Sequence, residues 1–117
     1  MEWLWRQRCL GTSPATLPSQ FTCANVAELD QAWQGETRQM RAFLGSIDEA
    51  ALEKVIVYRN TRDQDFTLPL WQILAHVVNH GTQHRTEAAM TLTHFGCSPG
   101  DIDLTVFLRE GSTGRSA

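Results

Sequence analysis

The longest helical pattern in the chain covers residues 69–94, and it constrains the fold more than any other segment. Pro69 suits the first turn of a helix, where its missing N–H needs no partner, and Gly96 suits the end. At roughly 100° per residue, the apolar side chains gather within about 40° of one line along the helix. This line predicts a buried stripe of Leu70, Leu74, Val77, Gly81, Ala88, Leu92 and Phe95.

Shorter helical patterns precede and follow this stretch. They predict helices over residues 2–10, 25–47 and 102–110. Asn25 is placed to cap the second of these, and Ser46 is placed to cap a short turn that follows it.

An extended pattern interrupts the helices. β-Branched and aromatic residues predict two short segments, 55–58 and 66–68, around a polar turn. We expect a loop over residues 11–20 and a disordered tail over residues 111–117. The predicted fold class is therefore all-α with a short extended hairpin, in a single domain over residues 1–110.

The composition excludes several classes of protein. Hydrophobic residues make up 42% of the chain and charged residues 20%, which is an ordinary globular balance. Ten basic and thirteen acidic residues give a net charge of −3, and the arginines are dispersed, which argues against a nucleic-acid partner. No apolar stretch reaches the roughly 18–20 residues of a membrane span. Glu2 stands where a signal peptide would be positive, so we expect a cytoplasmic protein with no membrane partner.

The three cysteines, Cys9, Cys23 and Cys97, form no CxxC pair. In a reducing cytoplasm free thiols are the default, and a disulfide between Cys9 and Cys23 is the alternative.

Three of the four histidines lie four residues apart in the long helix: His76, His80 and His84. Residues i and i+4 share a helix face about 6 Å apart along the axis, so two imidazoles can converge on one divalent ion. His76 and His84 are about 12 Å apart, too far for all three to converge readily. His84 lies about 40° and His80 about 80° from the centre of the apolar stripe. We therefore take His80 and His84 as the candidate metal ligands and expect His84 at the edge of the core.

Two neighbours are candidates to support this pair. Glu87, one turn beyond His84, is a possible metal ligand or a partner that orients an imidazole. Arg85 is a candidate for polar support, or its stem packs beside the core while its head meets solvent or a carboxylate. Spacing alone also leaves open that these histidines are hydrogen-bonded packing residues, since the helix lacks the stronger HExxH pattern.

The residues around this pair resemble the DinB family of bacterial helical proteins. The shared pattern is Asn79-His80, three residues, His84-Arg85, and then a turn with Gly96, Pro99, Asp101 and Asp103. Residues 3–14, from Trp3 to Pro14, are similar to the end of that family's second helix. The resemblance covers nearly the whole chain, and the histidine helix is its specific part.

The resemblance implies an up-up-down-down four-helix bundle and a divalent metal held by three histidines. Two of the three positions match His80 and His84, and the third belongs to the family's second helix, ahead of the tryptophan segment. The chain is therefore expected to lack the first helix and most of the second, which leaves the metal site incomplete within one chain. Glu87 stands where the family commonly has Gln. The expected metal is zinc, nickel or iron.

Two functions are compatible with these patterns. The first is a divalent-metal-binding protein, with the thiol transferase or hydrolase activity of some relatives on a small molecule that the sequence does not identify. The second is a non-catalytic remnant domain that dimerises and has an incomplete or empty metal site. In both cases the elements bury little surface at this length, so we expect a homodimer that completes the bundle across its interface.

Overall fold

The computed structural model describes residues 1–113. The element order is α1 (Glu2–Cys9), the 3-10 helix η1 (Ser19–Phe21), α2 (Val26–Gly45), α3 (Glu49–Leu52), β1 (Val55–Arg59), β2 (Asp65–Pro69), α4 (Leu70–His94) and α5 (Leu104–Thr113). The chain is thus mostly helical with one two-stranded antiparallel sheet, which confirms the predicted helical content and hairpin. It divides into two compact units, Met1–His80 and Gly81–Ala117. The four-helix bundle and the single domain stay predictions.

None of the helices that the structure describes is both long and apolar enough to cross a bilayer.

Cys9 and Cys97 are free thiols, so the alternative disulfide between Cys9 and Cys23 is not formed.

The starts of α3 and α4 differ from the prediction for different reasons. Asp48, and not Ser46, caps the short helix α3, because its carboxylate accepts the N–H of Ala51 at 2.8 Å. The Ser46 hydroxyl instead donates to the Phe43 carbonyl at 2.6 Å, at the end of α2. Pro69 does not open α4 but ends β2, where it lies opposite Val55.

The last helix is shifted toward the C-terminus. Asp103 accepts both the N–H and the hydroxyl of Thr105, at 2.7 and 2.8 Å, so α5 begins at Leu104 and not at residue 102. These hydrogen bonds lower the pKa of the Asp103 carboxyl. The helix continues to Thr113, three residues beyond its predicted end. The remaining predicted tail, residues 114–117, lies outside the described residues.

The start of α2 confirms the predicted Asn25 cap. The Asn25 side chain accepts the N–H of Glu28 at 3.0 Å, and the Glu28 carboxylate in turn accepts the N–H of Ala24 at 2.9 Å. This reciprocal arrangement satisfies two backbone donors at the helix end and fixes where the helix begins.

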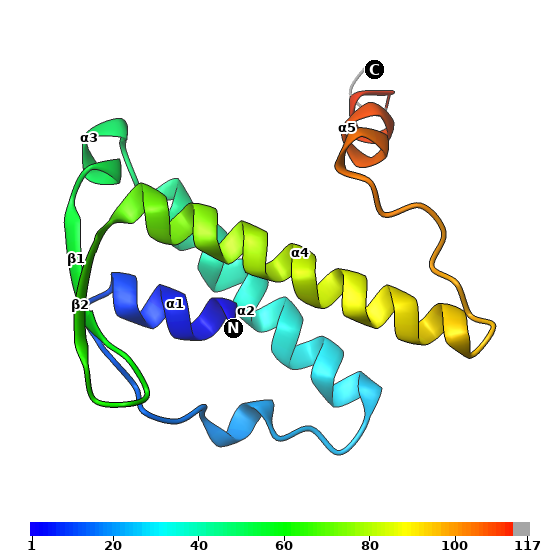
Figure 1. Cartoon of the computed structure of the whole chain (residues 1–117), viewed down its shortest axis with the longest axis horizontal. Helices are drawn as coiled ribbons and strands as arrows, with labels where there is room; N and C mark the ends of the chain where they lie inside the picture. Colours follow the sequence, from blue (N-terminus) through cyan, green and yellow to red (C-terminus); the bar gives the residue numbers. More distant parts are fainter. Residues whose placement is uncertain (114–117) are drawn as a thin grey trace. The chain divides into compact units, whose positions relative to one another are not determined.

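The core of the first unit lies where α1, the hairpin and the start of α4 meet. Its buried apolar side chains are Trp5, Ile56, Tyr58, Leu70 and Ile73. Figure 1 shows α1 beside the start of α4, with the hairpin across the ends of both. Ile56 and Tyr58 point inward because successive side chains of β1 alternate between its two faces, and Val55 and Val57 are exposed.

A buried ion pair joins α1 to α2. Nε and Nη2 of Arg6 donate to the two carboxylate oxygens of Glu36 at 2.7 and 2.8 Å, and each side chain is only 7% exposed. The hydrogen bonds to Glu36 raise the pKa of Arg6. Because both charges are removed from water, each depends on the other for compensation.

We predict that Glu36→Gln lowers the free energy of unfolding by about 3 kcal/mol, because it leaves the buried Arg6 guanidinium without its carboxylate. Urea unfolding followed by circular dichroism measures this loss. Asp30→Asn, an exposed acid on the same helix, is the control and should change stability little. A loss of equal size in the two variants would contradict the proposed role of the pair.

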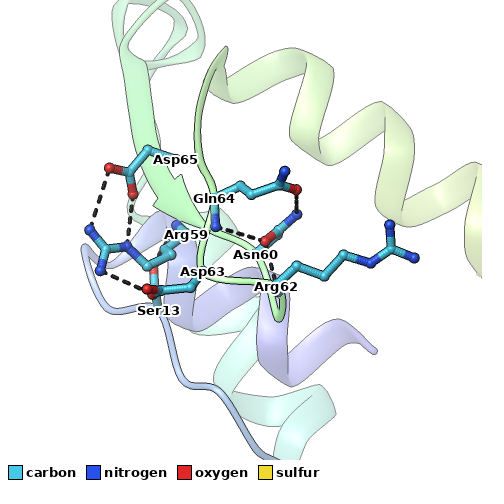
Figure 2. A network of polar contacts seen from close by, with 7 residues as sticks. All are labelled: Ser13, Arg59, Asn60, Arg62, Asp63, Gln64 and Asp65. Carbon is cyan, nitrogen blue, oxygen red and sulfur yellow. Dashed lines mark hydrogen bonds and ion pairs between the residues drawn. The ribbon is translucent and has the colours of Figure 1, made fainter.

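The hairpin turn is closed by one asparagine side chain (Figure 2). The Asn60 side-chain oxygen accepts the N–H groups of Arg62 and Gln64 at 2.8 and 3.0 Å. Asp63 adopts a φ of +63°, which the turn requires and which Asp tolerates better than most residues. Arg59 donates to the Asp65 carboxylate at 2.8 Å and lowers its pKa, so this ion pair is lost only as the pH falls through that lowered value.

We predict that Asn60→Ala lowers the free energy of unfolding by about 1 kcal/mol, because two backbone N–H groups of the turn lose their acceptor. Asn60→Asp keeps an acceptor oxygen in the same place and should retain most of the stability. Thermal unfolding of the three proteins provides the comparison. If the Ala and Asp variants were equally unstable, the acceptor would not be what closes the turn.

Candidate metal site on helix α4

The candidate ligands lie on one continuous helix. The N–H of Leu70 donates to the Lys54 carbonyl at 2.9 Å where α4 leaves the hairpin. At the other end Gly96 has a φ of +76°, and the N–H of Cys97 returns to the Leu92 carbonyl at 2.9 Å. A glycine at this position ends the helix as predicted. Since α4 is unbroken from Leu70 to His94, His80 and His84 are one helical turn apart.

His80 belongs to a row of aromatic rings in the first unit. Its ring centroid lies 5.4 Å from that of His76, and the His76 ring in turn meets the Trp5 ring edge-on at 4.9 Å. His80 is partly buried, and His76 is exposed. The contact between His76 and Trp5 was not predicted from the sequence, because helical spacing within one element does not reveal which residue of another element lies beside it.

His84, in the second unit, is hydrogen-bonded to Glu87. Its Nδ1 lies 2.9 Å from the Glu87 Oε2, and the two side chains are 58% and 72% exposed. The expectation that Glu87 orients an imidazole is consistent with this contact. The expectation that His84 lies at the edge of a core is wrong for the described chain. The reason is that the predicted stripe is exposed beyond Gly81, at Ala88, Leu92 and Phe95.

The contact with Glu87 has a chemical consequence for His84. A carboxylate accepts a hydrogen bond from a neutral imidazole only when the bonded ring nitrogen carries the proton. Protonation at Nδ1 leaves the lone pair on Nε2, which is the atom that would bind a metal. The same pairing of carboxylate and histidine orients ligands in many zinc sites.

Arg85 is held by its own helix. Its Nη2 donates to the Thr82 hydroxyl at 3.0 Å, and its guanidinium lies over Gly81, where an added Cβ would come within 2.9 Å of Nη1. Glycine at position 81 therefore makes room for the guanidinium. Arg85 is exposed, as expected if its head meets solvent, and its guanidinium also contacts a hydroxyl of its own helix.

The donor set on this chain is small. Within residues 1–113 the structure brings together no group of three or more histidine, cysteine, aspartate or glutamate side chains in a metal-holding arrangement. Two imidazoles one turn apart and one carboxylate beside them are of the type that zinc, nickel and iron accept. The chemistry of these donors fits a transition metal, and their number requires water or another chain to complete the coordination.

The comparisons with known proteins point to a single family. The family model described as "DinB family" matches residues 1–114. Neither the search of curated proteins nor the search of solved structures gave a match. Because the family model covers nearly the whole chain, this protein belongs to the DinB family.

Proposed function

We propose that this protein binds a divalent transition metal, zinc, nickel or iron, through His80 and His84. The observation that supports this proposal most strongly is the hydrogen bond between His84 and Glu87, which favours the tautomer with its lone pair on Nε2. The one-turn spacing of His80 and His84 on the continuous helix α4 provides a second imidazole on the same side.

The proposed site is incomplete within one chain. Structural zinc sites have four protein ligands and catalytic sites three, and His80 and His84 supply two. Water and a third protein ligand from a second copy of the chain would complete the coordination, because Glu87 is engaged with Nδ1 of His84 in this arrangement. A bound metal would lower the pKa of a coordinated thiol or water, which is the chemistry of a thiol transferase or a hydrolase. Activity on a small-molecule substrate is the finer part of this proposal.

We predict that the double variant His80→Ala/His84→Ala binds Zn²⁺ and Ni²⁺ at least tenfold more weakly than the natural chain, because it loses both imidazole ligands. Isothermal titration of the untagged protein with each metal measures the affinity, and elemental analysis measures the content. His94→Ala removes a histidine from the same helix and should leave both values unchanged.

An unchanged affinity in the double variant would contradict the proposed ligands. No measurable binding by the natural chain would favour the alternative of a non-catalytic domain with an empty site. A loss of metal affinity in the His94→Ala variant alone would place the metal elsewhere on α4.

We also propose that the chain forms a homodimer. Three large apolar side chains at i, i+3 and i+4 share one face of α5 and are each more than half exposed: Leu104, Phe107 and Leu108. Such a face favours association, and a second copy would also bring further ligands to an incomplete metal site.

We predict that the natural chain is a dimer at micromolar concentration and that Phe107→Glu shifts it to a monomer, because a carboxylate opposes burial of this face. Light scattering coupled to size-exclusion chromatography gives the mass. The control variant Arg109→Glu introduces a glutamate about 200° around the helix from position 107, outside the apolar face, and should leave the dimer intact. A folded, monomeric natural chain would contradict the proposal.

A further inference from the structure

Arg8 is a buried cation that has no anionic partner among the described residues. The residue is only 5% exposed, and its Nε is buried without a hydrogen-bond acceptor. Arg6, two residues earlier on the same helix, is buried to the same degree but is paired with Glu36 through two hydrogen bonds. The comparison shows that α2 provides a carboxylate to one buried guanidinium of α1, and that no described residue provides one to Arg8.

Aromatic rings hold the Arg8 guanidinium in place. Its Cζ lies 4.5 Å from the centre of the Trp5 ring and 5.1 Å from that of Tyr58. Ring faces stabilise a cation, but they do not accept the hydrogen bonds that its N–H groups can donate. Burial lowers the pKa of Arg8, yet a guanidinium stays charged at any physiological pH. The side chain is therefore a fixed positive charge with unused donors.

Arg8 lines a cavity between the end of α1 and β1. The cavity has a volume of about 380 Å³, and its lining runs over residues 8–11 and 54–57. Lys54 supplies a second cation, and no aspartate or glutamate is among the lining residues. The space is large enough for a small ligand, and its charge is positive.

The backbone of β1 adds a further donor on this side. In an antiparallel strand, alternate residues direct their N–H groups to opposite edges. The N–H of Arg59 points away from β2 and donates to the Ser13 hydroxyl at 2.9 Å. The N–H groups of the odd-numbered residues of β1 therefore point away from β2. Val57 shares this direction and lines the cavity, and none of the described residues accepts its N–H.

We propose that this cavity binds a small oxyanion, the carboxylate or phosphate group of a ligand, through Arg8, Lys54 and the backbone N–H of Val57. An anion there would lie beside Arg8, whose charge no described carboxylate compensates. The cavity contains none of the residues of the proposed metal site, so the test of one proposal is independent of the test of the other.

The test uses the full chain and two probes, sodium phosphate and sodium succinate, at ionic strength held constant with sodium chloride. We expect saturable shifts of the Val57 backbone amide in nuclear magnetic resonance spectra, and a higher midpoint of thermal unfolding, with at least one probe. Saturation by phosphate alone would identify a phosphate ligand, and saturation by succinate alone would identify a carboxylate ligand. No saturable shift of Val57 with either probe would overturn the proposal.

Matched variants test the residues. Arg8→Met should weaken binding at least tenfold and abolish the thermal stabilisation by the anion, while Arg62→Met removes an exposed arginine of the hairpin turn and should change neither. Because Arg8 is buried and Lys54 is exposed, Lys54→Met provides a second variant that leaves the core intact, with an expected loss of affinity of threefold or more. Natural affinity in either Arg8→Met or Lys54→Met would overturn the assignment of that residue.

Cys9 offers an independent measurement because it is half-buried and lines the same cavity. Burial raises the pKa of the Cys9 thiol and keeps it less reactive than an exposed thiol. The bound anion should slow alkylation of Cys9 by iodoacetamide at least threefold and leave the exposed Cys97 unaffected. Equal rates at Cys9 with and without the anion would contradict binding in this cavity.

Discussion

Trp5 is the side chain on which the first unit depends, because three elements meet at its ring. It packs edge-on against Tyr58 of β1 at 5.1 Å and against His76 of α4 at 4.9 Å, and Arg8 of its own helix lies over its face. The helix α1 has only eight residues, too few to be stable in isolation. Its position is therefore fixed by these contacts and by the ion pair between Arg6 and Glu36.

The same contacts link the packing of the unit to its chemistry. Through His76, the Trp5 ring is connected to His80, one of the two proposed metal ligands. Through Arg8, it borders the cavity to which we assign an oxyanion. Two buried arginines on one short helix thus have different roles: Arg6 holds α2 in place, and Arg8 has donors left for a ligand. Structural charges are usually paired when they are buried, and the unpaired one is the better indicator of function.

The sequence predicted those features that depend on local chemistry. The Asn25 cap, the end of α4 at Gly96 and the two extended segments were all predicted, because each follows from residues close together in the chain. The ion pair between Arg6 and Glu36 joins residues thirty positions apart, and the contact between Trp5 and His76 joins two distant helices. No periodicity within one element indicates such partners. For the candidate site, the spacing of the histidines and the approach of Glu87 could be predicted, but the exposure of His84 could not, because it depends on what covers the second half of α4.

The central claim is that His80 and His84 bind one metal ion through defined ring nitrogens. The most direct measurement is the ¹⁵N spectrum of the imidazole rings before and after one equivalent of Zn²⁺ is added. Our account predicts that His84 is protonated at Nδ1 beforehand, and that zinc shifts Nε2 of His84 together with one ring nitrogen of His80. Unchanged resonances of both rings, or shifts confined to His94, would contradict it.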